Sequence, residues 1–231
     1  MRPQWLPESV RGADGLSIST KIGDQHTRGT MAYQWLTADL HLGHANICIY
    51  SNRPFIMPED LGDDGFWVSR EAATQCAERM NDGLIARWNE RVSPEDTVYH
   101  LGDFINRGFA KKVAGLRDKA SDYEARLNGR IVHILGNHDR NNGLTRGLES
   151  ATIKAGGKIF LLKHHPVYDP NVDPPCNAVM CGHVHDNWDH KWEGGMLFIN
   201  VGVDVRSLRP VRLDEASGLF HKLTNERDQK S

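Results

Sequence analysis

The sequence predicts an α/β fold whose functional site lies along one edge of a sheet. Short apolar, β-prone runs alternate with helical stretches, and 39% hydrophobic with 25% charged residues is the composition of an ordinary globular domain. Most of the strand-like runs end directly in Asp, Asn or His residues. Ligands bind outside the carboxyl ends of strands in open α/β sheets, so this pattern indicates one shared site.

The first predicted element is a buried strand over residues 33–39, in which Trp35 and Leu36 precede charged residues. A long loop over residues 40–64 follows, and loops of that length inside a domain are usually functional. Ser69 is a suitable N-cap for an amphipathic helix over residues 71–92, whose apolar residues recur at helical spacings. The remaining strands are predicted at residues 97–101, 130–135, 158–162, 177–181 and 196–201.

Size and charge exclude several classes of protein. A chain of 231 residues buries enough surface to fold without a structural metal, so any metal site is free to be functional. Lys and Arg total 28 against 30 Asp and Glu, and a net charge of −2 disfavours long nucleic acid as a partner. No stretch approaches a membrane span and residues 1–10 lack the apolar core of a secretory signal, so a cytoplasmic protein without membrane contact is expected.

The chain is expected to contain one domain over residues 31–231. Residues 1–30 are polar and rich in glycine and show no sustained periodicity. This segment is therefore interpreted as an N-terminal extension without a folded core, and we expect it to be dispensable for folding.

Histidine has an unusual distribution, because seven of the twelve histidines fall in four short clusters. If the chain is extended after the first strand, Asp39 and His41 point to one side while Leu40 points into the core. Oxygen and imidazole donors without thiolates suit Mn, Fe, Co, Ni or Zn, and seven candidates are too many for one ion. The candidate ligands are Asp39, His41, Asp103, Asn137, His164, His183 and His185.

The sequence resembles the calcineurin-like metallophosphoesterases through five blocks that occur in the family order. The blocks are Asp39-Leu-His41, Gly102-Asp103, Gly136-Asn-His-Asp139, His164 with Pro166, and Gly182-His-Val-His185. The resemblance covers about residues 33–204 and implies a four-layer αββα sandwich, with two mixed β-sheets flanked by helices. The segments Asn52-Arg-Pro-Phe55 and Asn200-Val-Gly-Val-Asp204 are similar to small single-domain members, including phage-encoded phosphodiesterases that work in the host cytoplasm.

This resemblance implies a centre with two divalent metal ions, for which Mn is expected and Fe, Zn, Ni or Co are alternatives. One ion would be held by Asp39, His41, Asp103 and His185, and the other by Asp103, Asn137, His164 and His183. Asp103 would bridge the two ions and would count as catalytic, because a metal-bridging hydroxide is the nucleophile in such centres.

The resemblance also assigns residues to the substrate. His138 is not a ligand in the family and would act as general acid or as a donor to the transition state. Arg107 matches the family arginine that holds phosphate, and Asn137 is expected to contact the substrate as well. Asn106 replaces an acid that pairs with the catalytic histidine in many family phosphatases, which makes His138 a weaker base.

Other side chains have two interpretations each. His44 either faces the substrate from the loop or belongs to the loop alone, and Arg53 either binds a phosphate or anchors the loop on an acidic neighbour. His165 is expected to pack locally beside His164. Three aromatic residues either stack on a nucleobase or belong to the core: Tyr168, Trp188 and Trp192.

The leading functional hypothesis is a phosphoesterase that hydrolyses small phosphodiesters, with cyclic nucleotides such as 2′,3′-cyclic NMP favoured by the resemblance. The alternatives on the same fold are a protein or nucleotide phosphomonoesterase and a nuclease, the latter disfavoured by the missing basic excess. A non-catalytic scaffold is disfavoured because the chain keeps every candidate ligand together with His138. The oligomeric state is left open.

Overall fold

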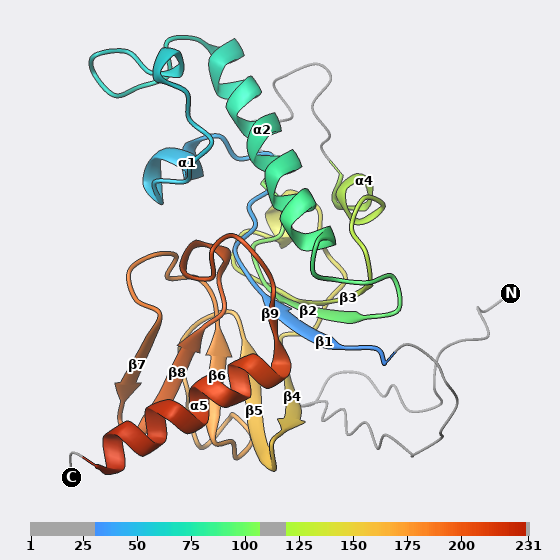
Figure 1. Ribbon diagram of the computed structural model, residues 1–231, viewed down its shortest axis with the longest axis vertical. Coiled ribbons are helices and arrows are strands. Elements are labelled where there is room, and N and C mark those ends of the chain that lie inside the picture. Colours follow the sequence, from blue (N-terminus) through green and yellow to red (C-terminus); the bar gives the residue numbers. More distant parts are fainter. Residues whose placement is uncertain (1–30, 107–118, 230–231) are drawn as a thin grey trace, which may run out of the picture.

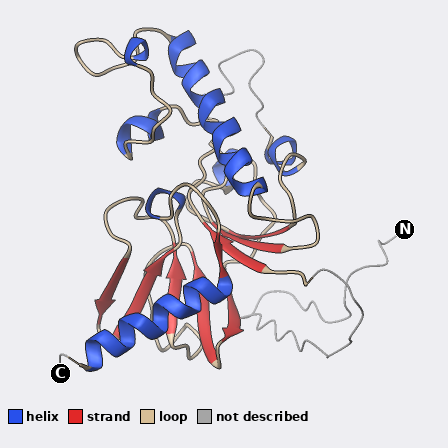
Figure 2. Cartoon of the chain, viewed as in Figure 1, coloured by secondary structure: helices blue, strands red, loops and turns tan. Residues whose placement is uncertain are grey.

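Two mixed β-sheets with helices packed against them make up the computed structural model, which describes residues 31–106 and 119–229 (Figure 1, Figure 2). The strand order is β3-β2-β1-β9 in the first sheet and β4-β5-β6-β8-β7 in the second. The predicted α/β class with two mixed sheets flanked by helices is therefore confirmed. The predicted extension over residues 1–30 and the predicted phosphate ligand Arg107 lie outside the described residues.

The first sheet is built on three parallel strands, β1 (Gln34–Thr37), β2 (Thr97–Leu101) and β3 (Arg130–Ile134), with β9 (Val211–Arg212) antiparallel to β1. Because side chains alternate along each strand, Trp35 packs on the outer face of the sheet and Leu36 on the inner face. All three parallel strands end at the same edge, which brings the segments that follow them together.

The second sheet is also built on three parallel strands, which lie in its centre, and it has an antiparallel strand at each edge. The central strands are β5 (Lys158–Lys163), β6 (Ala178–Cys181) and β8 (Met196–Asn200). The edge strands are β4 (Ser150–Ala155) and β7 (His190–Glu193), neither of which was predicted from the sequence.

The main core lies on the inner faces of both sheets and also receives α5 (Leu213–Asp228), which crosses the strands of the second sheet in Figure 1. Phe220 of α5 packs edge-on against Phe160 of β5, with 5.4 Å between the ring centroids. The sequence analysis did not identify this helix, although its buried apolar residues recur at three- and four-residue spacings.

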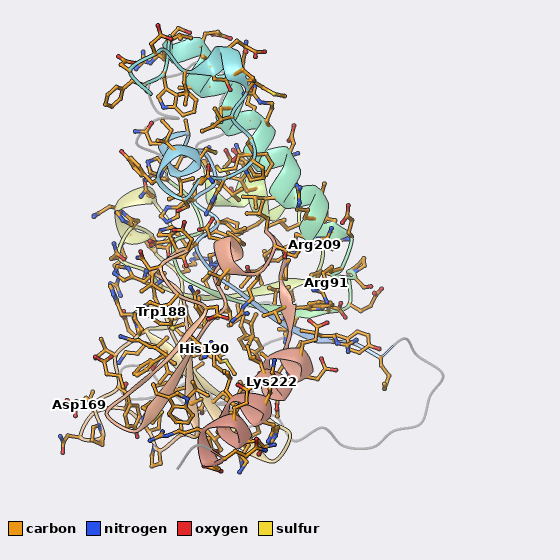
Figure 3. The ribbon with its side chains drawn as sticks, turned by 60° about the vertical axis from the view of Figure 1, so that its left-hand side comes forward. Arg91, Asp169, Trp188, His190, Arg209 and Lys222 are labelled. Atoms are coloured by element: carbon orange, nitrogen blue, oxygen red, sulfur yellow. The ribbon has the colours of Figure 1, made fainter. Side chains whose placement is uncertain are left out.

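The outer face of the second sheet is covered, within the described ranges, by side chains from loops and strand ends. Tyr168 and Trp188 pack against a small cluster around Val179 and Phe198 (Trp188 is labelled in Figure 3). Trp192 packs against the main core instead. These aromatic residues therefore follow the core interpretation.

The outer face of the first sheet packs against α2 (Arg70–Asn89), the helix that was predicted from residue 71. The hydroxyl of Ser69 accepts a hydrogen bond from the Ala72 N–H at 3.0 Å, so the predicted N-cap is confirmed. The long loop before α2 contains α1 (Asn46–Tyr50) and the 3₁₀ turn η1 (Pro58–Asp60). No helix in the described part of the chain is long and apolar enough to cross a membrane.

Short helical elements complete the described chain. They are α4 (Ala120–Glu124), η2 (Arg140–Asn142) and η3 (Val203–Val205), of which η2 follows the end of β3 and η3 follows the end of β8. The four cysteines are free, and Cys48, Cys76 and Cys181 are buried. The fold is thus held by its two apolar cores without a disulfide.

Packing of the long loop on α2 depends on a glycine. A Cβ on Gly83 would lie less than 3.0 Å from the buried ring of Phe55, whereas a Cβ on Gly218 of α5 would meet open space. We expect Gly83→Ala to destabilise the fold by about 1–3 kcal/mol through overpacking. Gly218→Ala should instead stabilise it by up to about 1 kcal/mol, the helix propensity difference alone. Urea denaturation measures both, and equal stabilisation by the two variants would contradict this packing.

Candidate metal centre

The candidate site begins where the parallel strands of both sheets end, and the backbone there adopts a conformation that residues other than glycine rarely take. Five predicted ligands have left-handed φ angles between 48° and 74°: Asp39, His41, Asp103, His183 and His185. Such conformations are costly and are found mainly where the surrounding structure and a function require them. Their concentration at these strand ends marks this edge of the sheets as the functional one.

One detail of the sequence prediction is wrong. Asp39 and His41 were expected to share a side because the chain stays extended, but β1 ends at Thr37 and both residues are left-handed. The turn is held by backbone bonds, in which the Asp39 and His41 N–H groups donate to carbonyls of the segment after β2. Leu40 is buried in the core as predicted. The left-handed turn therefore separates Leu40 from Asp39 and His41, as the extended chain was expected to do.

Asp103 lies at the centre of the cluster. Its Oδ2 is 3.5 Å from Nε2 of His41 on one side and 3.6 Å from Nε2 of His164 on the other. Its Oδ1 accepts a hydrogen bond from the backbone N–H of His138 at 3.0 Å. A carboxylate in this place has one oxygen between two imidazoles from different sheets, which is the arrangement that a bridging ligand needs.

The other predicted ligands surround Asp103. Asn137 Oδ1 lies 3.0 Å from His164 Nε2 and 3.1 Å from His183 Nδ1, and the Asp39 carboxylate accepts the His183 N–H. Three sets of donor atoms lie within 4.8 Å of one another and could hold an ion: Asp39, His41 and His185; Asp39, Asp103 and His164; His164, His165 and His183. The structure therefore brings all seven predicted ligands together.

His165 joins this cluster, although the sequence analysis gave it only a packing role. Its ring centroid lies 4.2 Å from that of His183 and 5.0 Å from that of His164. Sequence position next to His164 was the only available signal, and it could not show that the neighbouring side chain turns to the same site.

Two imidazoles are oriented by hydrogen bonds on the ring nitrogen that faces away from the cluster. Nδ1 of His164 lies 2.8 Å from the Leu101 carbonyl oxygen, and Nδ1 of His185 lies 2.8 Å from Oδ2 of Asp204. A carbonyl or carboxylate oxygen only accepts, so Nδ1 carries the hydrogen and Nε2 keeps its lone pair for a metal. These contacts preset the tautomer that ligation requires.

Asp139, the last residue of the Gly-Asn-His-Asp block, frames the site without facing it. Its carboxylate is fully buried and accepts backbone N–H groups from Gly136 at 2.7 Å and from Asp103 and Phe104 at 2.9 Å each. It thereby ties the segment after β2 to the segment after β3. Gly102 is needed in the same place, since its φ is 90° and a Cβ would collide with His164.

Burial dominates the electrostatics of the cluster. It raises the pKa of Asp39 to about 8 and raises that of Asp103, in each case against the opposing attraction of nearby histidines. It lowers the pKa of His41 well below its usual value, and those of His164 and His183 to about 4. Burial thus disfavours the charged forms of these two acids and of these three imidazoles. His185 differs, because its hydrogen bond to Asp204 and the charge of Asp39 raise its pKa.

The donors present fit a divalent cation. Both ring nitrogens of His41 are buried without any hydrogen-bond partner, and leaving such a group unpaired is unfavourable. A coordinated cation would be a partner for one of these nitrogens. Its positive charge would also stabilise the ionised forms of the buried carboxyl groups of Asp39 and Asp103. Oxygen and imidazole donors without thiolate are the ligands that Mn, Fe, Co, Ni and Zn accept.

His138 and His44 lie beside this cluster. The ring centroid of His138 is 5.7 Å and that of His44 is 5.8 Å from the centroid of His41. His138 is exposed, and His44 is half-buried with a pKa lowered to about 4 by burial and by the charge of Arg53. Both side chains are thus close enough to meet a substrate bound at the cluster.

Of the two interpretations of Arg53, the contacts favour the anchor on an acidic neighbour over a substrate-binding residue. Its side chain is buried, and Nε and Nη2 donate to the two oxygens of Asp204 at 2.7 and 3.0 Å. The remaining donors go to the backbone carbonyls of Asp39 at 2.7 Å and Leu40 at 2.9 Å and to Sδ of Met80 at 3.4 Å. Arg53 has no group left for a phosphate, so it anchors the loop on an acidic neighbour.

Comparison with known proteins adds the family. The model of the calcineurin-like phosphoesterase superfamily domain matches residues 81–215, more than half of the chain. An uncharacterized protein of Methanocaldococcus jannaschii is 35% identical over 196 residues, which cover 81% of this chain and 91% of that protein. The gene 66 protein of Mycobacterium phage D29 is 29% identical over 116 residues, 50% of this chain and 45% of the phage protein.

A solved structure supports the fold alone. A protein of unknown function from Aquifex aeolicus superposes with a TM-score of 0.53 at 20% identity, covering 82% of this chain and all of that chain. The segment matched by the family model contains Asp103, Asn137 and the later histidines, while Asp39 and His41 precede it and are brought to the same cluster by the fold. The family model and the 35% identical relative show that the chain belongs to the calcineurin-like phosphoesterase superfamily, a family of hydrolases.

Proposed function

We propose that this protein is a metal-dependent phosphodiesterase that uses two divalent ions to hydrolyse small phosphodiesters. The observation that carries the proposal is the convergence of seven donor residues, six of them around Asp103, with a buried His41 whose ring nitrogens have no hydrogen-bond partner. Seven donors exceed the needs of a single ion, and Asp103 stands between the two halves of the set.

The chain's own residues would divide into two ligand sets. Asp39, His41 and His185 would hold one ion, Asn137, His164 and His183 the other, and Asp103 both. When bound, the two ions would neutralise phosphate charge and activate a water molecule as the nucleophile. The two carboxylates cancel only half of the four positive charges, so the site would attract a phosphate oxyanion and stabilise the charge that develops in the transition state.

His138 would handle the proton on the leaving oxygen. Its backbone is anchored to Asp103 by the 3.0 Å hydrogen bond, and its side chain is exposed beside the donor cluster. An imidazole in that place reaches a substrate without being consumed as a ligand, which is the requirement for a general acid. His44 lies on the other segment beside His41 and would contact the substrate from the loop.

We infer small phosphodiesters as the substrate class, with cyclic nucleotides such as 2′,3′-cyclic NMP favoured. The absence of a basic excess in the sequence disfavours long nucleic acid, and the family resemblance favours the diester. A phosphomonoesterase is the second candidate, because the same donor cluster would bind a terminal phosphate equally well.

The direct test is a metal-by-substrate screen on protein stripped of metal. We expect Mn²⁺ to restore hydrolysis of bis-p-nitrophenyl phosphate and 2′,3′-cyclic NMP in preference to p-nitrophenyl phosphate. Asp103→Asn should abolish turnover of every substrate, because both ions lose their shared ligand. Preference for the monoester would favour the phosphatase alternative, and an Asp103→Asn activity within about tenfold of wild type would remove the proposed bridge.

The raised pKa of Asp39 predicts a conflict between stability and metal binding. Its folded pKa of about 8 exceeds the unfolded value of 3.8, so between these values the folded chain keeps a proton that the unfolded chain releases. The metal-free protein therefore loses stability as pH rises through this window. Since one pKa unit corresponds to about 1.4 kcal/mol, metal-free Asp39→Asn should be at least ~1 kcal/mol more stable than wild type at pH 8.5.

Urea denaturation in EDTA at pH 5 and pH 8.5 measures this effect. The advantage of Asp39→Asn should shrink at pH 5, and the variant should gain no stability from Mn²⁺ while wild type does. An advantage of the same size at both pH values would show that the Asp39 carboxylate is not the group that titrates.

A general acid matters only when the leaving group is poor, and this gives a test of His138. With p-nitrophenolate, which departs unprotonated, His138→Ala should lose little activity. With 2′,3′-cyclic NMP, whose leaving group is an alkoxide, it should lose roughly 10²–10⁴-fold in kcat. Equal losses on both substrates at unchanged metal content would instead assign His138 to charge stabilisation or substrate positioning.

A further inference from the structure

We propose that the buried Arg53–Asp204 ion pair is a positioning element that sets three ligands of one ion, namely Asp39, His41 and His185. The inference rests on the proposed function, because it takes these side chains as metal ligands. It goes beyond that function because neither Arg53 nor Asp204 contacts the place where an ion or a substrate would bind. Both act through the groups that do.

The pair itself is closed to solvent and makes two contacts. Nε of Arg53 lies 2.7 Å from Oδ1 of Asp204 and Nη2 lies 3.0 Å from Oδ2, while the two side chains are 1% and 2% exposed. A planar guanidinium with both contacts made to one carboxylate has a fixed orientation. The remaining N–H groups of Arg53 therefore also point in fixed directions.

The acceptors of these N–H groups lie in the left-handed turn that contains two proposed ligands. Nη2 of Arg53 donates to the carbonyl of Asp39 at 2.7 Å, and Nη1 donates to the carbonyl of Leu40 at 2.9 Å. The turn has φ angles of 59° at Asp39 and 50° at His41, which an isolated chain would avoid. Arg53 thus holds the strained peptide units on either side of Leu40 in place.

Asp204 orients the third proposed ligand, His185. Its Oδ2 accepts from Nδ1 of His185 at 2.8 Å while both oxygens also accept from Arg53. This contact leaves Nε2 of His185 as the free donor and places the ring beside that of His41, with centroids 5.1 Å apart and an interplanar angle of 27°. Donor atoms of Asp39, His41 and His185 consequently lie within 4.8 Å of one another.

The pair also joins distant parts of the chain. Arg53 comes from the long loop before α2 and Asp204 from η3 after β8, 151 residues further along. Arg53 therefore links the loop to the site through the ion pair, whereas His44 of the same loop would contact the substrate directly. A carboxylate that orients a ligating histidine typically changes metal affinity by 10–100-fold when it is removed.

Isothermal titration of the EDTA-stripped protein with Mn²⁺ tests the proposal, with Asp204→Asn as the variant. Asparagine keeps the shape of the side chain but loses its charge and places an amide where Arg53 donates. We expect one of two ions to bind 10–100-fold more weakly and the other to keep its wild-type affinity. Arg53→Lys, which keeps the charge but not the two-contact geometry, should weaken the same ion.

A matched control is the exposed pair of Asp189 with His190, in which Asp189 Oδ1 lies 2.7 Å from His190 Nδ1 (His190 is labelled in Figure 3). Asp189→Asn removes the same kind of carboxylate–histidine contact away from the proposed ligands, so both Mn²⁺ affinities should stay at wild-type values. Loss of one ion in this control as well would overturn the specific role of Asp204.

A measurement on the wild-type protein decides the matter if Asp204→Asn fails to fold. Nitrogen-15 NMR of the metal-free protein at pH 9 should show His185 with its hydrogen on Nδ1, and an Nε2-protonated ring would overturn the proposal. Wild type that binds no Mn²⁺ would overturn the proposed function and the inference together. Two ions bound by Asp204→Asn with wild-type affinity would overturn only the positioning role.

Discussion

The burial of two carboxylates, Asp39 and Asp103, at the edge where the parallel strands of both sheets end is the constraint on which the rest of the structure depends. Each acid resists ionisation there because burial raises its pKa, and burial also lowers the pKa of the ligands His41, His164 and His183. The positive charge of the neighbouring Arg53 is already paired with Asp204. A bound cation would complete the contacts of this cluster, and the neighbouring residues hold its side chains in place.

Three residues hold the cluster in place, and each does so at the backbone of the segments that contain the ligands. The Asp139 carboxylate collects N–H groups from the segments after β2 and β3, and the guanidinium of Arg53 fixes carbonyls of the turn after β1. Gly102 supplies a conformation and a space that a side chain would deny to His164. The strain of five left-handed ligand residues is thereby offset by hydrogen bonds and packing outside the ligand set, which is how strained functional sites persist.

Much of the candidate site could be predicted because its donors sit at the ends of apolar runs, and the sequence shows both the run and its end. Asp103 and His164 were placed in this way and meet in the structure. The pattern does not contain φ angles, so the turn at Asp39 was expected to be extended when it is left-handed. Nor does it show partners far along the chain, which is why Arg53 was open to a phosphate role until its contact with Asp204, 151 residues away, was known.

The same distinction explains the fold. The identified strands combine apolar or β-prone residues with a polar ligand-type residue directly after them, whereas β4 and β7, which lie at the sheet edges and carry polar residues, show no such pattern and were not identified. Arg53 and Asp139, which hold the segments of the candidate ligands, are themselves buried. Because a group such as Asp39 opposes folding when it is ionised without a cation, ion binding would contribute to the stability of the fold as well as to catalysis. A site built this way couples its own occupancy to the integrity of the chain that forms it.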